Sequence, residues 1–312
     1  MKVFAVKHKD EKTRAASRSG GIFTAISDQY LNGGVVYGCI LDDEFNACHI
    51  RAEDSFRRDK MRGSKYVQSQ MMDCFKQIKK DLDENKNVLF SGTSCQVAGL
   101  RCFLQKDYAN LLCMDIVCHG VPSPKVWHEF LRWISNGQKV TEVDFRNKID
   151  FGWASHTETL IISGKKINSE VWKNIFYSHN ALRPSCYECP YKSIYHPGDV
   201  TIADYWGIDQ AAPGFNDNKG VSLVLVNTEK GVDAFEKAKE NIEWRETKIE
   251  DSMQPPLRAP FPKPESRVRF WNDLKNKDFS FIAKKYGSSK KTSLIRRITQ
   301  KVKHLLSKLM KK

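Results

Sequence analysis

The hydrophobic positions of this chain form two kinds of run: short apolar runs typical of buried strands, and longer runs with helical spacing. The short runs predict strands over residues 3–7, 35–41, 47–53, 88–90, 111–117, 198–209 and 221–227. Helical spacing predicts helices over residues 22–31, 71–85, 96–104, 125–134, 170–182 and 228–242. Strands that alternate with helices are typical of α/β proteins. We therefore predict an α/β fold, a mixed sheet with helices on both faces.

The pattern changes after residue 138. Residues 140–168 read as shorter antiparallel strands, and PPLRAPFPKP at residues 255–264 reads as an extended connector. We therefore predict an α/β domain at residues 1–138, a smaller α+β part at 139–254, a linker at 255–289 and a helix at 290–312. In the last segment aliphatic residues recur at helical spacing with Lys and Arg between them, which predicts a basic amphipathic helix.

Charge is concentrated at the C-terminal end. The formal net charge is +14, and residues 284–312 hold eleven Lys or Arg with no Asp or Glu, which leaves the rest of the chain at about +3. A basic amphipathic helix suits an anionic membrane surface, and docking on the body of the protein or on an acidic partner is the alternative. The cations alternate with aliphatic rather than aromatic residues, so the sequence does not favour nucleic-acid binding.

The composition also bears on location and on cysteine chemistry. No apolar run of 18 residues is present and the N-terminus has no apolar signal core, so we expect a cytoplasmic protein, peripheral on the inner membrane face if residues 290–312 bind lipid. Nine scattered cysteines in such a compartment favour ligands or buried thiols over disulfides.

Four of the nine cysteines stand at turns, where predicted strands end or in a short C-x2-C motif. Cys95 and Cys118 each follow a buried strand, and Cys186 and Cys189 form the motif, with Pro190 after it. Four thiolates around one point suit a [4Fe–4S] cluster or a structural zinc. The alternative is a zinc or dithiol site made by Cys186 and Cys189 alone, with the other cysteines structural.

Other residues have chemistry that suits a bound ligand. The small-residue turn at residues 17–21 suits a phosphate or is an ordinary N-cap. Arg62, Lys65, Tyr66 and Gln68 surround Gly63 and suit a phosphorylated planar ligand or a solvated helix end. His119 and Asp204 stand at strand ends, where they are candidate proton donors.

Five segments together resemble the coenzyme F420 hydrogenase/dehydrogenase beta subunit family of iron–sulfur flavoproteins. They are SRSGGIFTAI, MRGSKYVQS, SGTSCQVAGL, DIVCHGVPSP and RPSCYECPYK…GDVTIADYWGI. The resemblance extends from about residue 3 to about residue 206 and weakens towards residue 241. The resemblance implies a [4Fe–4S] cluster on Cys95, Cys118, Cys186 and Cys189, and FAD. The implied flavin-binding residues are Ser19, Gly20, Gly21, Thr24, Lys65, Tyr66, Gln68, Gly92 and Thr93.

The resemblance also implies a function. Members of the family move electrons between the cluster, FAD and a deazaflavin. The family's frequent N-terminal ferredoxin module is not found before Val3, so we expect electrons from an external carrier, a ferredoxin-like protein or a deazaflavin. Chains of this form resemble those associated with bacterial surface-polysaccharide biosynthesis. The alternative is a non-catalytic, metal-stabilised scaffold in a polysaccharide assembly complex. The sequence leaves the oligomeric state, including a homo-oligomer, open.

Overall fold

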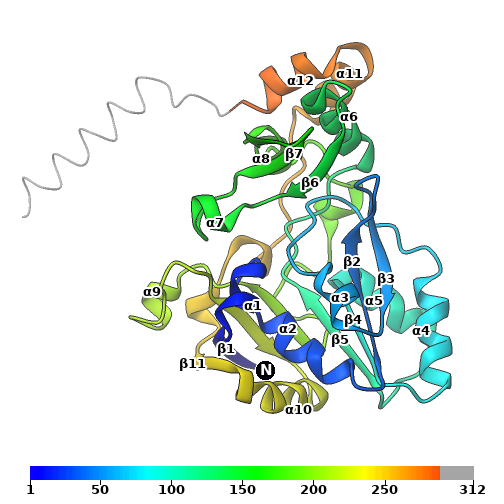
Figure 1. Cartoon of the computed structure of the whole chain (residues 1–312), viewed down its shortest axis with the longest axis vertical. Helices are drawn as coiled ribbons and strands as arrows, with labels where there is room; N and C mark the ends of the chain where they lie inside the picture. The colour runs from blue at the N-terminus through cyan, green and yellow to red at the C-terminus, as the bar shows by residue number, and fades with distance from the viewer. Residues whose placement is uncertain (289–312) are drawn as a thin grey trace, which may run out of the picture.

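The computed structural model describes residues 1–288, and its centre is an eight-stranded sheet with the order β11-β1-β10-β9-β5-β4-β2-β3 (Figure 1). The strands are β1 (Lys2–His8), β2 (Val35–Leu41), β3 (Ala47–Ala52), β4 (Val88–Thr93), β5 (Leu111–Ile116), β9 (Val200–Asp204), β10 (Ser222–Val226) and β11 (Ile242–Thr247). Strands β2, β4, β5 and β9 run parallel, while β3 and β10 pair antiparallel with β2 and β9. The central strands are apolar on both faces because helices cover both faces.

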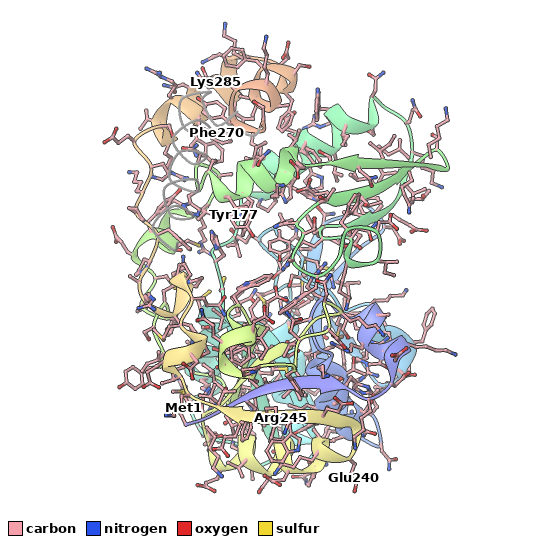
Figure 2. All side chains as sticks on the ribbon, turned by 90° about the vertical axis from the view of Figure 1, so that its left-hand side faces the viewer. Met1, Tyr177, Glu240, Arg245, Phe270 and Lys285 are labelled. Atoms are coloured by element: carbon pink, nitrogen blue, oxygen red, sulfur yellow. The ribbon has the colours of Figure 1, made fainter. Side chains whose placement is uncertain are left out.

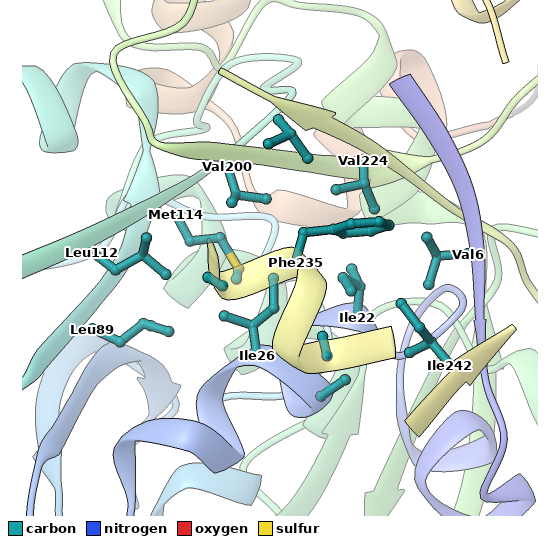
Figure 3. Close-up of a cluster of buried hydrophobic side chains, with 14 of the residues drawn as sticks. Val6, Ile22, Ile26, Leu89, Leu112, Met114, Val200, Val224, Phe235 and Ile242 are labelled. Carbon is teal, nitrogen blue, oxygen red and sulfur yellow. The ribbon is translucent and has the colours of Figure 1, made fainter. Parts of the chain in front are cut away.

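One face of the sheet is covered by helices α2 (Ile22–Ser27) and α10 (Glu229–Ala238). Figure 3 shows their apolar side chains meeting those of β1, β4, β5, β9 and β10, with Phe235 of α10 at the centre. The Phe235 ring stacks on Phe4 with ring centroids 4.2 Å apart. Helices α4 (Cys74–Asp83) and α5 (Ser94–Leu104) cover the opposite face. The predicted mixed sheet with helices on both faces is therefore confirmed.

A second, smaller layer lies beyond the carboxyl ends of the parallel strands (Figure 1). It contains a three-stranded antiparallel sheet of β6 (Val140–Asp144), β7 (Glu158–Ile162) and β8 (Lys165–Ser169). Helices α6 (Pro124–Ser135), α8 (Val171–Tyr177), α11 (Arg267–Asn276) and α12 (Phe279–Tyr286) share its core. Trp127 and Trp172 are buried at the middle of that core with ring centroids 4.9 Å apart. Figure 2 shows Phe270 and Lys285 of this layer at the opposite end of the molecule from Met1 and Arg245.

The structure differs from the predicted linker at residues 255–289. Helices α11 and α12 lie in it, and Phe270 and Ile282 are fully buried against the small layer. The predicted linker extends the proline-rich connector at 255–264 too far, because the apolar residues after it fall in two short groups separated by the polar residues 275–278. The segment 139–254 also forms no unit of its own, since strands β9, β10 and β11 complete the sheet that β1–β5 begin.

The helix predicted at residues 290–312 lies outside the described residues. Among residues 1–288, no helix has both the length and the apolar character needed to cross a membrane.

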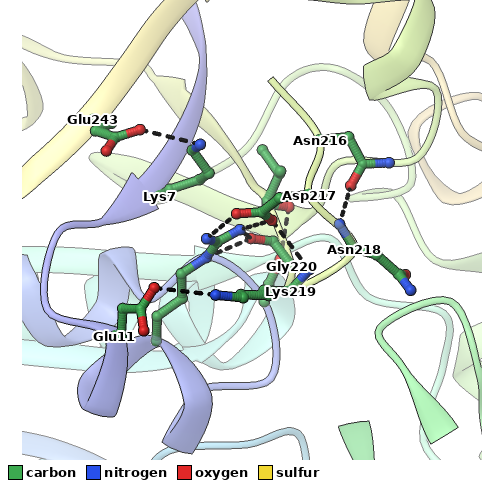
Figure 4. Close-up of polar contacts among 12 residues, drawn as sticks. Lys7, Glu11, Asn216, Asp217, Asn218, Lys219, Gly220 and Glu243 are labelled. Carbon is green, nitrogen blue, oxygen red and sulfur yellow. Dashed lines mark hydrogen bonds and ion pairs between the residues drawn. The ribbon is translucent and has the colours of Figure 1, made fainter. Parts of the chain in front are cut away.

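Helix α1 (Glu11–Ala16) fixes the loop that leads into β10 (Figure 4). The buried Arg14 guanidinium pairs with Asp217, and its Nε donates to the Gly220 carbonyl at 3.1 Å. Lys219 adds an ion pair to Glu11 at 3.0 Å. These contacts hold the start of β10 beside the residues that precede α2. The shorter helices are α3 (Ser55–Asp59), α7 (Lys148–Phe151) and α9 (Ile208–Ala211).

Candidate redox site

The carboxyl ends of β4, β5 and β9 lie at one edge of the sheet, because these strands are parallel. Cys95 is the second residue of α5, directly after β4, and Cys118 lies two residues after β5. Asp204 is the last residue of β9. The fold therefore brings the two single cysteines and Asp204 to the same edge, as expected from their positions at strand ends.

The Cys118 loop lies directly against the segment that carries the C-x2-C motif. Pro122 and Leu182 form an antiparallel bridge, and the Arg183 amide donates to the Val121 carbonyl at 2.9 Å. Gly120 has a φ of +119°, and a Cβ at this position would lie 2.9 Å from Leu182 Cδ1 and 3.5 Å from Cys186 Cβ. Glycine is thus needed both for the backbone conformation and for the close approach of the two loops.

The thiols of this region are close enough to interact electrostatically. Burial raises the pKa of the Cys118 thiol to about 12, and Cys186 and Cys95 contribute in the same direction. Burial also raises the pKa of Cys186, with further contributions from Cys95 and Cys189. The structure therefore brings all four predicted ligands into one region of the sheet edge. Within residues 1–288, however, no three His, Cys, Asp or Glu side chains are near enough together in this conformation to hold a metal ion.

Lys192 is a cation of this region that the sequence analysis missed. It is only 5% exposed, its Nζ donates to the His119 carbonyl at 2.9 Å, and it lies over the Phe261 ring at 4.6 Å. Burial lowers the pKa of Lys192, while Cys118 and both motif cysteines act to raise it. Burial outweighs these cysteines, and only their thiolate forms would favour the charged ammonium group. Its position three residues after Cys189 is the only sequence signal that could have identified it.

Several contacts orient the single cysteines. The Gly120 amide donates to Cys118 Sγ at 3.3 Å, and Thr93 Oγ1 lies 3.1 Å from Cys95 Sγ. Gly92 and Thr93, two predicted flavin-binding residues, end β4 beside Cys95. Cys95 is exposed, and so is Cys102 on the same helix.

A buried hydrogen-bond network, also missed by the sequence analysis, joins the strands behind the cysteines. Asp115 of β5 is fully buried and accepts from Thr201 Oγ1 of β9 at 2.6 Å. His196 Nδ1 lies 3.0 Å from Asp115 Oδ2 and 3.1 Å from Ser94 Oγ at the start of α5. This network fixes the ends of β5, β9 and α5 relative to one another.

The structure places the two candidate proton donors in different surroundings. The His119 ring packs on Phe261 with centroids 4.1 Å apart, and its Nε2 lies 2.7 Å from His179 Nε2. Burial lowers the pKa of His119 to about 3, so the imidazole is neutral at ordinary pH. Asp204 forms an ion pair with Arg146 at 2.5 Å and accepts from Trp153 Nε1 at 2.8 Å. Both remain candidates for proton chemistry.

The predicted flavin-binding residues before α2 are packed between strands. Ser19 Oγ donates to the Val221 carbonyl at 2.7 Å, and the Gly20 amide donates to Ser222 Oγ at 2.9 Å. A Cβ on Gly20 would lie 2.0 Å from the Val6 carbonyl oxygen, so glycine is required for this packing. Gly21 is the N-cap residue of α2 and has a φ of +95°, and the buried Thr24 accepts from Arg62 at 3.0 Å through its hydroxyl.

The residues that follow Gly63 connect the cysteine loops to β9. The Gln68 amide donates to the Pro122 carbonyl at 3.0 Å, and Tyr66 Oη accepts from Arg146 at 3.2 Å. Arg146 in turn pairs with Asp204. Lys65 donates to the carbonyls of Lys60, Met61 and Arg62 at 2.9, 3.0 and 2.9 Å. A continuous set of contacts therefore runs from the Cys118 loop to the end of β9.

A cavity of about 260 Å³ lies between the two layers, bounded by residues 15–18, 62–65 and 143–149. Its lining includes five cationic side chains and one carboxylate, which are Arg18, Arg62, Lys65, Arg146, Lys148 and Asp144. Lys65 is the predicted flavin-binding residue that lines this cavity. Arg18, Arg146 and Lys148 had no sequence signal, because each comes from a turn or short helix without a recurring pattern.

A larger hollow of about 460 Å³ lies elsewhere on the small layer, lined by Phe45, His128, Leu131 and Val140 among others. It includes none of the predicted site residues.

Comparisons with known proteins bear on this geometry. Residues 85–252, more than half of the chain, match the family described as the C terminus of the coenzyme F420 hydrogenase/dehydrogenase beta subunit. The structure is similar to a chain of the F420-reducing [NiFe] hydrogenase complex from Methanosarcina barkeri, solved in a xenon derivatisation, with a TM-score of 0.55 and 16% sequence identity. The match covers 78% of this chain and 81% of that chain, and at this identity it shows the fold alone. The comparison with curated proteins found no match.

Proposed function

Because the chain belongs to the coenzyme F420 hydrogenase/dehydrogenase beta subunit family, we propose that it is an oxidoreductase that uses a [4Fe–4S] cluster and FAD. Its electrons come from an external carrier, a ferredoxin-like protein or a deazaflavin. The observation that supports this best is the contact between the Cys118 loop and the C-x2-C segment at the sheet edge where Cys95 also lies. Three separate loops thereby supply four thiols to one region.

The ligand residues in this proposal are Cys95, Cys118, Cys186 and Cys189. Two contacts would favour thiolates here: the Gly120 amide donates to Cys118 Sγ, and the buried Lys192 ammonium lies near Cys118, Cys186 and Cys189. Hydrogen bonds to sulfur and nearby charge are the means by which a protein sets the potential of such a centre.

The flavin lies beside these loops in the proposal, along the contacts that join Gln68, Tyr66, Arg146 and Asp204. When bound, a flavin exchanges an electron pair as hydride and a cluster exchanges single electrons, so the two together link the two kinds of transfer. Arg146 and Trp153 hold the Asp204 carboxylate in one orientation through both of its oxygens. Asp204 and His119, whose neutral imidazole still carries one ring N–H, are the residues that we propose for proton transfer at this site.

We further propose that this activity serves surface-polysaccharide biosynthesis, for which the support is the family resemblance of the sequence. Attachment to an anionic membrane surface through residues 290–312 belongs to the same proposal, and its support is the basic amphipathic pattern of that segment.

Single-turnover reduction of the bound flavin tests the proposed function. Protein reconstituted with iron, sulfide and FAD under anaerobic conditions is mixed with a reduced ferredoxin, and the flavin absorbance band is followed with time. We expect the band to bleach in the wild type and in Cys102→Ser, whose exposed thiol is outside the ligand set. Cys189→Ser should retain FAD but lose the transfer. Equal bleaching in Cys189→Ser, or a colourless wild type with one zinc per chain, would contradict the proposal.

A further inference from the structure

The cavity between the two layers contains cations that lack a carboxylate partner. Arg18, Lys65 and Lys148 are partly buried, and no ion pair involves any of them within residues 1–288. Their hydrogen bonds go to backbone carbonyls instead: Arg18 donates to Trp153 at 3.1 Å, and Lys148 donates to Arg14 at 2.6 Å. A buried cation without a counter-ion is costly, because neutral carbonyls offset only part of the lost hydration.

The other charges around the cavity do not remove this excess. Arg62 pairs with Asp59 and Arg146 pairs with Asp204, so each of these cations is already balanced. Among the described residues that line the cavity, Asp144 is the one with an acidic side chain, and its carboxylate accepts from the Arg146 amide at 2.9 Å. The cavity therefore has a positive potential that an anion would neutralise.

The pKa values of two of these cations are lowered by the same burial without counter-ions. Burial, with repulsion from Arg18 and Arg14, lowers the pKa of Lys148 to about 8. Burial, with repulsion from Arg146, lowers the pKa of Arg18 to about 10. The Arg18 Nε atom is also buried and has no hydrogen-bond partner in the described part of the chain, although Arg18 itself keeps two bonds to carbonyls. A free donor beside an uncompensated charge is typical of a site whose partner is an anion.

We propose that this cavity binds a diphosphate group, with Arg18 and Lys148 as its charged ligands and Arg62 beside them. The volume of about 260 Å³ falls below the roughly 300–1,000 Å³ of pockets for drug-sized ligands, so it suits a diphosphate rather than a whole dinucleotide. Leu41, Phe145 and the exposed Ile149 form an apolar wall for the organic group that the diphosphate carries.

This inference rests on the proposed function where the diphosphate is that of FAD, and stands apart from it where a phosphorylated substrate supplies the group. The two sources present the same chemistry to the cavity. They differ in whether a protein already loaded with FAD still has the cavity free.

Calorimetric titration of the full chain with inorganic pyrophosphate tests the proposal. We expect the FAD-free wild type to bind pyrophosphate, and Lys148→Met and Arg18→Gln each to bind at least about tenfold more weakly, because each removes one charge from the cavity. Lys165→Met removes the same charge from the exposed strand β8 and should bind like the wild type.

A variant that should bind pyrophosphate more tightly separates an effect on the cavity from a loss of folding, because a misfolded protein would not bind more tightly. Asp144→Asn removes the acidic side chain of the lining while its oxygen can still accept from the Arg146 amide, so pyrophosphate should bind about threefold or more tightly. Loss of pyrophosphate binding on FAD loading identifies the flavin as the source, and retained binding identifies a phosphorylated substrate.

Equal affinity in the wild type, Lys148→Met and Asp144→Asn would overturn the proposal, as would a folded wild type that binds no pyrophosphate. Iron and sulfide are measured in the same samples. A protein that binds pyrophosphate but assembles no cluster would contradict the proposed function and leave the diphosphate site in place.

Discussion

Replacing Gly120 with alanine perturbs the contact between the Cys118 loop and the C-x2-C segment more directly than any cysteine substitution. Two costs arise at this position. The φ of +119° is a conformation that residues with a Cβ rarely adopt, which costs about 1–2 kcal/mol. The new Cβ would also lie 2.9 Å from Leu182 Cδ1, and Leu182 is buried and has little room to move. Overpacking of this kind costs about 1–3 kcal/mol.

Gly137 provides a matched control for the backbone cost. It follows α6 with a φ of +76°, and a Cβ there would have no atom of residues 1–288 within 4 Å. Gly137→Ala should therefore lower the free energy of unfolding by about 1–2 kcal/mol, and Gly120→Ala by about 2–5 kcal/mol. The difference between the two variants measures how closely the two loops approach.

The assay is urea unfolding of both variants and the wild type without metal, followed by iron and sulfide analysis after anaerobic reconstitution. Gly120→Ala should retain less iron than Gly137→Ala, because moving the Cys118 loop away from Cys186 separates two proposed ligands. If the two variants unfold at the same urea concentration and hold the same iron, the two loops do not form the close contact on which the site depends.

Three further predictions concern buried charge. Burial raises the pKa of Glu158 to about 8, so its folded form keeps a proton that the unfolded chain releases near pH 4.5. The free energy of unfolding should therefore fall as pH rises between these values. In urea unfolding, Glu158→Gln should be more stable than the wild type by a few kcal/mol near pH 8 but by little near pH 4.5, whereas the exposed Glu142→Gln should match the wild type at both pH values. Asp204→Asn should cost about 2–4 kcal/mol, since Arg146 is 4% exposed and loses its carboxylate; a cost no larger than that of the exposed Asp209→Asn in the same urea unfolding would argue against this pairing. Lys192→Met should lower the reduction potential of a reconstituted cluster by on the order of tens of millivolts in a redox titration, because it removes a cation near the thiols. A potential equal to that of the exposed Lys263→Met would show that this cation is too far from the cluster to change its potential.

The strands and helices of the main sheet follow closely from the sequence because burial on both faces imposes continuous apolar runs. Residues 111–117 read as a buried strand, and β5 occupies Leu111–Ile116. Strand β11 was not predicted from the sequence. It is an edge strand, and four of its six residues are exposed, including Glu243 and Trp244. Its polar residues therefore give no apolar run.

The candidate site also has parts that could be predicted from the sequence and parts that could not. Cys95 and Cys118 could be placed together because each follows a parallel strand, and parallel strands end at one edge. The cavity could not be predicted, since Arg18, Arg62 and Lys148 come from three segments far apart in sequence that meet only when the small layer packs on the main sheet. Ser19 and Gly20 show why a small-residue turn is an ambiguous signal in a sequence. Such a turn can bind a ligand, but here it also packs against the start of β10 through hydrogen bonds.

In the proposed site, four thiols from three loops hold one cluster. Iron and acid-labile sulfide analysis of the full chain, purified and reconstituted without oxygen, tests it most directly. We expect about four iron and four sulfide per chain, and loss of both when Cys118 and Cys186 are replaced together by serine. One zinc per chain without sulfide, or an unchanged iron content in that double variant, would contradict it.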